Sequence, residues 1–286
     1  MIVHLLVALL TLMSTPLLAS SDSVSTVRDE KITSVYLNRK ITLDILLPPD
    51  YVNTQTVYPV LLMNDGQDLE RLRLATTLDS LYQARAIRPF ILVAIHAGDR
   101  VHEYGTSSQP DYMKRGSKAA DYSRFVRKEL LPHIRHYYRV SHYPEDNAFA
   151  GFSLGGLMAF DLVWNHPDVF RKAGVFSGSF WWRSRAFDEK YTDADRIMQH
   201  DVMAGTYKKG LEFWLQTGTL DEADDRDNDG VIDSIDDTLA LIAELEKKGY
   251  RWGRDIKYVE VKGGHHDQDT WGRIMPQFLI WAFGRK

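Results

Sequence analysis

The chain has 286 residues, of which 44% are hydrophobic and 26% charged, and its formal net charge is -4. This composition excludes disordered, collagenous and coiled-coil proteins, and the length suits one α/β domain. A weakly acidic chain without a basic stripe is unsuited to a phosphate backbone, so we expect no nucleic-acid partner.

The N-terminal segment has the pattern of a secretory signal. Residues 1–19 contain no Asp, Glu, Lys or Arg and run through an apolar core to Pro16. This predicts a protein that is periplasmic or secreted, with an uncleaved anchor as the alternative because a basic n-region is missing. No later segment is apolar for long enough to span a bilayer, so we expect no stable membrane insertion after signal removal. Residues 20–286 are predicted to form one domain.

Strands and helices alternate along the predicted domain. Two strand-like runs at residues 32–37 and 41–47 are joined at a polar pair, as in a tight antiparallel hairpin. The later strands are apolar runs without period-two alternation, which predicts an α/β fold with a mostly parallel central sheet and helices on both faces. Ligands bind such sheets beyond the carboxyl ends of the strands. The predicted strands are 58–63, 90–96, 148–152, 173–176, 211–216 and 256–261, and the predicted helices are 69–83, 119–138, 157–164, 239–248 and 271–283.

A GxSxG motif follows the strand predicted at residues 148–152. Residues 151–156 read Gly-Phe-Ser-Leu-Gly-Gly, and a helical pattern begins at once. A serine on a sharp strand-to-helix turn has strained backbone angles, and the glycines avoid collisions with the neighbouring strand and helix. The same turn aims the Leu154 amide at the oxygen of a bound ester. Gly-rich turns also occur without catalysis, but the strand before and the helix after favour Ser153 as a nucleophile.

A base and an acid are expected downstream of the serine. A serine hydroxyl is a weak nucleophile alone, and the α/β-hydrolase order is serine, acid, histidine. Asp221 and the pair His265 and His266 each follow a predicted strand, on the same sheet edge as Ser153. Two other histidines near this edge precede the serine and break the expected order, namely His96 and His102.

These motifs resemble the putative esterase family of α/β-hydrolases, which includes esterase D, feruloyl esterases and enterochelin esterases. The likeness spans about residues 32–281. The further matching segments are Tyr-Pro-Val-Leu at 58–61, Asp-Gly-Gln at 65–67, Arg100 with Glu-Tyr at 103–104, Glu-Leu-Leu-Pro at 129–132 and Ser-Gly-Ser-Phe-Trp-Trp at 177–182. The segment at 177–182 resembles the enterochelin esterase branch.

The resemblance implies a Ser-His-Asp triad. The family's histidine commonly stands in a Gly-x-His-Asp context five residues before a tryptophan. His266 has this spacing to Trp271, whereas His265 misses it by one residue. The resemblance therefore implies Ser153 as nucleophile, His266 as base and Asp221 as the acid that orients it.

The oxyanion hole and the acid loop also follow from the resemblance. It implies that the loop at residues 65–67 supplies a second oxyanion amide at Gln67, beside that of Leu154. The acid loop departs from the family, because nine acidic residues and one arginine stand between positions 221 and 237. This crowding leaves Glu222 and Asp224 as alternatives to Asp221.

Three residues are candidate substrate contacts. Trp181 and Trp182 suit the wall of a pocket for an aromatic or flat acyl group, although paired tryptophans are also ordinary packing residues. Arg100 suits an anionic or catecholic substrate group. The structural alternative for Arg100 is an ion pair with Glu103.

Residues 225–236 have the spacing of an EF-hand-type calcium loop. Gly230 at position six permits the sharp turn. Position twelve is an aspartate, which reaches less far than glutamate, and the helix that precedes an EF-hand loop is missing. We therefore predict a static structural Ca²⁺ site, with a solvated acidic turn as the alternative. The predicted ligands are Asp225, Asp227, Asp229, the carbonyl of Val231, and Asp236.

The leading prediction is an exported serine carboxylic ester hydrolase that forms an acyl-enzyme on a small-molecule ester. Aromatic or siderophore-type esters are expected, and no cofactor is needed for catalysis. Mycolyltransferases share this architecture, so an acyltransferase that uses a sugar hydroxyl is a second hypothesis. A secreted calcium-binding recognition module without activity is the third. The fold alone does not determine the natural ester.

Overall fold

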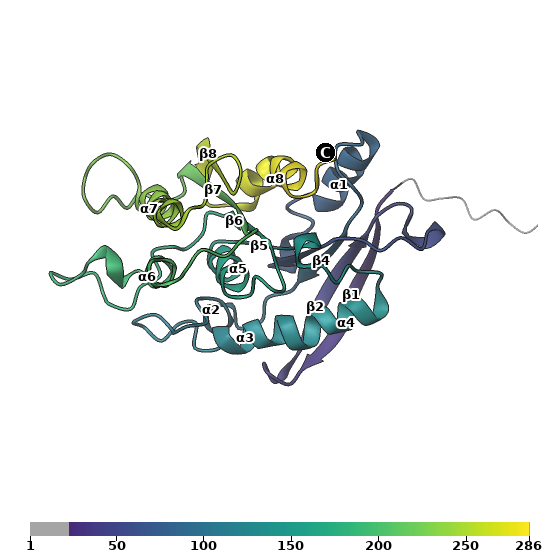
Figure 1. Ribbon diagram of the computed structural model, residues 1–286, viewed down its shortest axis with the longest axis horizontal. Coiled ribbons are helices and arrows are strands. Elements are labelled where there is room, and N and C mark those ends of the chain that lie inside the picture. The colour runs from purple at the N-terminus through teal and green to yellow at the C-terminus, as the bar shows by residue number, and fades with distance from the viewer. Residues whose placement is uncertain (1–22, 286) are drawn as a thin grey trace, which may run out of the picture.

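The computed structural model describes residues 23–285, so the predicted signal at residues 1–19 lies outside the described residues. The described strands form one eight-stranded sheet in the order β1-β2-β4-β3-β5-β6-β7-β8 (Figure 1). Their bounds are Ser25–Ser34 for β1, Arg39–Leu47 for β2, Val60–Asn64 for β3, Ile91–Ile95 for β4, Asn147–Phe152 for β5, Lys172–Phe176 for β6, Glu212–Leu220 for β7 and Ile256–His265 for β8.

The sheet is mixed only at its N-terminal side. Strands β1 and β2 form the predicted antiparallel hairpin, β2 is also antiparallel to β4, and the other neighbouring strands are parallel. Strand β1 begins at Ser25, earlier than the apolar run that predicted it. Its first half is exposed on both faces, so hydrophobicity could not reveal it.

Helices cover both faces of the sheet, as predicted. One apolar cluster packs α1 and α8 against one face, and a second cluster packs α3 to α7 against the other (Figure 1). Among residues 23–285, no helix combines the length and hydropathy needed to cross a membrane. The helices are α1 Leu74–Gln83, α2 Arg100–Glu103, α3 Ala119–Phe125, α4 Leu131–Tyr137, α5 Leu154–Asn165, α6 Ile197–Ala204, α7 Asp233–Lys248 and α8 Gln268–Phe283.

The helix predicted at residues 119–138 is interrupted by a wider turn. A π-helical segment, Val126–Leu130, separates α3 from α4, and Pro132 stands in the first turn of α4. Proline has no N–H for the helix ladder and its ring displaces the preceding carbonyls, which accounts for the local change of pitch.

Strands β7 and β8 run further than predicted. They pair in parallel from Phe213 and Ile256 up to Leu220 and His265, so the polar ends of both strands are held by their mutual backbone bonds. Asp221 is therefore the first residue after β7. His266 is the first after β8, on the neighbouring strand and at the same edge of the sheet.

Candidate active site

Ser153 occupies the sharp turn between β5 and α5. Its backbone angles are φ 56° and ψ −123°, a conformation that is strained for a residue with a side chain. The Ser153 N–H donates to the Phe176 carbonyl at 2.9 Å, and the Ser153 carbonyl accepts from the Gly156 N–H at 3.0 Å. These bonds hold the turn between the neighbouring strand β6 and the first turn of α5.

The two glycines flanking the serine are required by close contacts. A Cβ at Gly151 would lie 2.2 Å from the Gly155 carbonyl oxygen, across the turn itself. A Cβ at Gly155 would lie 2.7 Å from a carboxylate oxygen of Asp65. The GxSxG pattern thus allows α5 to start directly over the end of β5 and against the loop that follows β3.

A cavity of about 230 Å³ opens beside Ser153. It gathers four of the residues singled out from the sequence, which come from four different elements: the serine, His266, Gln67 and Arg100. The complete lining is Asp65, Gln67, Asp68, Arg100, Phe152, Ser153, His266, Gln268 and Trp271.

His266 has the environment expected of a base. Its ring packs edge-on against Trp271 with 5.2 Å between the ring centroids, and the residue is accessible to solvent at the cavity. Desolvation by the surrounding protein lowers the pKa of His266 below its ordinary value of 6.5; the Asp221 charge opposes this shift and the Arg100 charge adds to it. The imidazole is therefore neutral at neutral pH, the form that can accept a proton.

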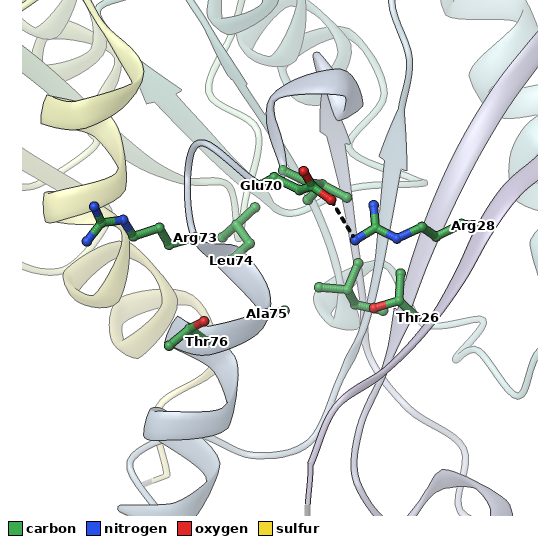
Figure 2. Close-up of a pocket in the computed structure, with 9 residues that line it drawn as sticks. Thr26, Arg28, Glu70, Arg73, Leu74, Ala75 and Thr76 are labelled. Carbon is green, nitrogen blue, oxygen red and sulfur yellow. Dashed lines mark ion pairs between the residues drawn. The ribbon is translucent and has the colours of Figure 1, made fainter.

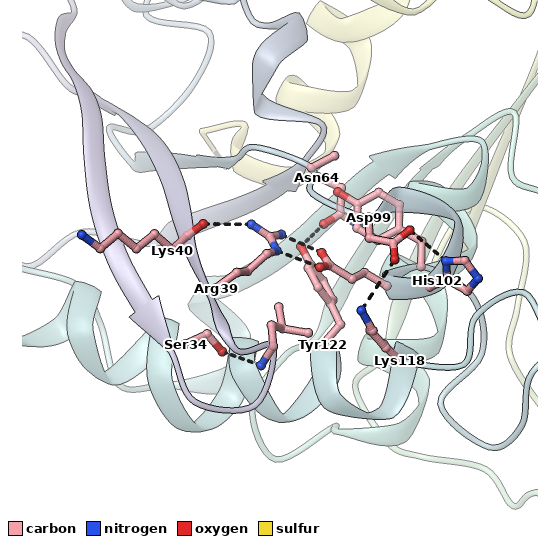
Figure 3. Close-up of polar contacts among 12 residues, drawn as sticks. Ser34, Arg39, Lys40, Asn64, Asp99, His102, Lys118 and Tyr122 are labelled. Carbon is pink, nitrogen blue, oxygen red and sulfur yellow. Dashed lines mark hydrogen bonds and ion pairs between the residues drawn. The ribbon is translucent and has the colours of Figure 1, made fainter.

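The other histidines near this edge do not line the Ser153 cavity. His265 is the exposed last residue of β8, and its backbone N–H donates to the Thr270 hydroxyl at 2.9 Å. His96 and His102 are each paired with a carboxylate outside the cavity, His96 with Asp44 at 3.0 Å and His102 with Asp99 at 2.8 Å (Figure 3).

Asp221 lies next to His266 but is anchored by the backbone. Its Oδ2 accepts from the Gly218 N–H at 2.9 Å. Burial raises the pKa of Asp221, and the Gly218 N–H, the Ser177 hydroxyl and the nearby His266 oppose the shift. No hydrogen bond joins Ser153, His266 and Asp221 directly in residues 23–285. Catalytic hydrogen bonds are often long before substrate binds.

The alternative acids lie at a different cavity. Glu222 and Asp224 line a space of about 620 Å³ that does not include Ser153 or His266. Burial raises the pKa of Glu222 to about 7, with repulsion from neighbouring carboxylates, among them Asp224, adding to the effect. This placement favours Asp221 over Glu222 and Asp224 as the acid that acts on the histidine.

The two expected oxyanion amides border the serine. Leu154 is the first residue of α5, so its N–H has no intrahelical acceptor. Gln67 lies in a 3₁₀ turn, Gly66–Asp68, and lines the cavity. Two hydrogen bonds hold its side-chain amide: Nε2 donates to Asp65 at 3.3 Å, and Oε1 accepts from the Ala97 N–H at 3.1 Å.

The tryptophan pair divides into a core residue and a pocket residue. Trp182 is 0% exposed and packs against Gly105 and Gly116, so it offers no surface to a ligand; the expected substrate contact at this position is corrected to a packing role. Trp181 is half-buried and lines the 620 Å³ cavity together with Tyr112, Phe187 and Tyr191. The guanidinium of Arg115 lies over the rings of Trp181 and Trp182, at 5.0 and 5.3 Å from their centroids.

Arg100 does not pair with Glu103, the partner expected as its structural alternative. Its guanidinium pairs with Asp65 at 2.9 Å, whereas Glu103 pairs with Arg39 at 2.6 Å. Sequence reasoning did not single out Asp65 as an ionic partner. The Asp-Gly pair at 65 and 66 is a turn signal, and Asp65 has the positive φ of 60° that such turns permit.

The acidic loop places three of its five predicted ligands together. Oxygen atoms of Asp225, Asp227 and Asp229 all lie within 4.8 Å of one another. Asp236 lies in the first turn of α7, and the nearby charges of Asp229 and Asp227 help burial to raise its pKa. The N–H of Val231 donates to Asp229 at 2.8 Å. Helix α7 follows the loop, but strand β7 precedes it in place of a helix.

A further cavity of about 210 Å³ lies between β1 and the start of α1 (Figure 2). An ion pair of 3.1 Å between Arg28 and Glu70 crosses it. Its lining contains Thr26 and Thr76 but no serine, cysteine or histidine. Nothing in this lining suggests nucleophilic chemistry.

The sequence profile of the family described as "Putative esterase" matches residues 34–282 of the chain. The chain belongs to the putative esterase family. The protein is thus an ester hydrolase, and a purely structural recognition module is set aside. The resemblance inferred from the motifs is confirmed.

This esterase is similar in sequence to the uncharacterized protein YbbA of Bacillus subtilis (strain 168), at 28% identity over 87% of the chain and 94% of that protein. Its fold is similar to that of a ferulic acid esterase, with a TM-score of 0.69, 19% identity, and coverage of 91% and 98% of the two chains. It is also similar to the enterobactin esterase of Shigella flexneri solved with 2,3-dihydroxy-N-benzoyl-glycine, with a TM-score of 0.68 and 22% identity. That match covers 91% of this chain but only 59% of the enterobactin esterase.

Proposed function

We propose that this esterase is an exported serine hydrolase that acts through Ser153, His266 and Asp221. The observation that carries the proposal is a serine in a strained strand-to-helix turn, on the wall of a cavity that also contains His266. Such a turn presents the hydroxyl to a ligand. Export rests on the apolar pattern of residues 1–19, which lie outside the described residues.

In the proposed reaction, the Ser153 oxygen attacks the ester carbonyl carbon while His266 accepts the hydroxyl proton. The N–H groups of Leu154 and Gln67 stabilise the negative charge on the carbonyl oxygen. His266 returns the proton to the leaving alcohol as its C–O bond breaks, and an acyl-enzyme remains. His266 then accepts a proton from a water molecule, whose oxygen attacks the acyl carbon. The bond between the acyl carbon and the Ser153 oxygen breaks, His266 returns the proton to that oxygen, and the free acid leaves. The reaction needs no cofactor.

Asp221 is proposed to orient His266 and to stabilise its charged form. Support comes from the charges of Asp221 and His266, each of which opposes the effect of burial on the pKa of the other. Glu222, in contrast, lines a cavity that does not include His266. Burial favours the protonated form of Asp221, and a positive imidazolium beside it opposes that preference.

For the acyl group of the substrate we propose an aromatic ring. Trp181, Tyr112 and Tyr191 give the 620 Å³ cavity aromatic walls. Trp181 stands two residues after Ser179, whose N–H donates to the Ser153 carbonyl at 3.2 Å, so this wall begins close to the nucleophile turn in the chain. Two proteins of similar fold support an aromatic acyl group: one is a ferulic acid esterase, and the other is an enterobactin esterase solved with 2,3-dihydroxy-N-benzoyl-glycine.

We expect feruloyl and dihydroxybenzoyl esters to be hydrolysed with a kcat/KM at least about tenfold above matched aliphatic esters, because the apolar contacts differ. Steady-state assays with one common leaving alcohol measure this. Trp181→Ala should reduce the preference, while Trp252→Ala, at an exposed tryptophan elsewhere, should not. Equal rates for both ester classes would contradict the aromatic assignment. A sugar ester formed when sugars are added would identify an acyltransferase instead of a hydrolase.

We also propose that the loop at 225–236 holds a structural Ca²⁺. Three clustered carboxylates and an aspartate in the following helical turn offer hard oxygen ligands. Bound Ca²⁺ should raise the free energy of unfolding by about 2.7 kcal/mol at a hundredfold excess over Kd. Because the loop begins four residues after Asp221, the metal should also stiffen the acid's loop.

Thermal unfolding in EDTA and in millimolar CaCl₂ tests the calcium loop. The midpoint should rise with CaCl₂ for the native chain and stay unchanged for Asp227→Asn/Asp229→Asn, which removes two ligand charges. Identical midpoints in both buffers, with no calcium found by elemental analysis, would leave an acidic surface turn.

A further inference from the structure

We propose that Arg100 and Asp65 form a positioning pair that holds the oxyanion turn of Gln67 against the nucleophile turn of Ser153. This inference rests on the proposed function, since it assigns a positioning role to residues beside the proposed nucleophile. It replaces the role of Arg100 as a receptor for substrate anions.

Arg100 connects three elements through one side chain. From helix α2, its Nε donates to Asp65 Oδ1 at 2.9 Å and its Nη2 donates to Asp65 Oδ2 at 3.2 Å, after the end of β3. The same Nη2 donates to the Phe152 carbonyl at 3.1 Å, at the end of β5. Phe152 is the residue immediately before Ser153. A planar guanidinium is the only side chain that can make this fork and the third bond together.

Asp65 is the residue from which the oxyanion turn starts. It is 2% exposed and has φ 60°, and the 3₁₀ turn that contains Gln67 begins directly after it. Its carboxylate also accepts from Gln67 Nε2 at 3.3 Å. A non-glycine residue keeps such a conformation only where its surroundings over-determine it, and here Arg100 supplies two of the bonds that do so.

The same pair also touches the nucleophile turn from its other side. Gly155 is a glycine because the Asp65 carboxylate occupies the space of a Cβ. Next to Asp65, Asn64 donates to the Gly155 carbonyl at 2.9 Å and accepts from the Tyr122 hydroxyl at 2.6 Å (Figure 3). Two consecutive residues at the end of β3 thus fix where α5 begins relative to the oxyanion turn.

Charge explains why both partners are needed. Asp65 lines the same cavity as Ser153, so its buried carboxylate would repel the developing oxyanion, and Arg100 neutralises that charge. Arg100 is only one-third exposed, and three of its five N–H donors are already used. A guanidinium whose charge is compensated in this way is poorly suited to attract a distant substrate anion.

The test compares Arg100→Gln, Arg100→Lys and Asp65→Asn on two aryl esters that differ only in a carboxylate on the acyl group. Positioning predicts a loss of kcat of about 100-fold that is equal for both esters, because the variants disturb one oxyanion donor. KM should change little. Lysine should fail to rescue, since it cannot make the fork, and Asp65→Asn/Arg100→Gln should be no worse than the poorer single variant.

Two further readouts separate positioning from a loss of folding. The affinity for a neutral trifluoromethyl ketone, which forms an oxyanion on the serine, should fall in parallel with kcat/KM. The acid limb of the pH profile of Arg100→Gln should move to higher pH, since the Arg100 charge lowers the pKa of His266. Arg39→Gln is the matched control, because it breaks a similar pair with the buried Glu103 that contacts neither turn. It should lower the unfolding temperature without the same loss of kcat.

The positioning role would be overturned if the arginine variants only raised KM and did so only for the ester that carries a carboxylate. Full activity of Arg100→Lys would overturn it as well. Asp65→Asn preserves the side-chain shape and removes a buried charge, so it provides the measurement if the arginine variants do not fold. Ser153→Ala in the same series tests the proposed function separately. Undiminished hydrolysis by that variant would overturn the nucleophile, whereas an anion-selective effect at Arg100 would overturn only the pair.

Discussion

Ser153→Ala is expected to lower kcat/KM for every hydrolysed ester by about 10⁴-fold or more, because no other group can form the acyl-enzyme. The fold should be unaffected. The turn is held by backbone bonds of Ser153 to Phe176 and Gly156, which an alanine keeps, and by the close approach of Gly151 to Gly155.

Steady-state kinetics and a thermal unfolding curve for the same preparation check this result. Ser179→Ala is the matched control, because the Ser179 hydroxyl lies 3.4 Å from that of Ser153 and its loss removes a neighbouring hydroxyl only. We expect a far smaller defect for it. Ser153→Ala that keeps more than a tenth of the native turnover would rule out the covalent mechanism.

His266→Ala should cost about as much activity as Ser153→Ala, since triad members act as a unit. His265→Ala should be nearly normal. The reason is the position of the two side chains: His266 packs on Trp271 beside the cavity, while His265 ends β8 in solvent. Kinetics of the paired variants decide between them. A severe loss at His265 with normal activity at His266 would reverse the assignment.

The pH dependence of the native enzyme reports the same histidine. Its pKa is lowered below 6.5, and only the neutral ring accepts the serine proton. Activity should therefore be constant around neutral pH and decrease as the pH falls through that lowered pKa. An acid limb centred above 6.5 would conflict with the environment of His266.

The order of the strands was predictable from local signals, and so was the order of the helices except for α2 and α6. The same signals predicted that Ser153, Asp221 and His266 follow strands at one edge of the sheet. The glycines around Ser153 and the spacing of His266 to Trp271 are short-range patterns, and apolar runs mark buried strands directly. The exposed half of β1 and the polar ends of β7 and β8 carry no such signal, so those strands were predicted too short.

The partners of individual side chains could not be predicted, because they depend on how distant segments meet. Asp65 and Arg100 form an ion pair only when β3 and α2 come to the same edge of the sheet. Glu103 is close to Arg100 in the chain but forms its ion pair with Arg39. The two tryptophans at 181 and 182 look alike in sequence. Only the packing of Gly105 and Gly116 shows that Trp182 belongs to the core.

Trapping the acyl-enzyme tests the central claim most directly. The native enzyme is mixed with an activated feruloyl ester, quenched in acid within the first turnovers, and examined by intact-protein and peptide mass spectrometry. We predict one feruloyl adduct on the peptide that contains Ser153 and no adduct on Ser153→Ala. If a variant of His266 still acylates, its adduct should accumulate to a higher level than that of the native enzyme. An adduct at another residue, or steady turnover without any adduct at Ser153 under conditions where release is slow, would contradict the account.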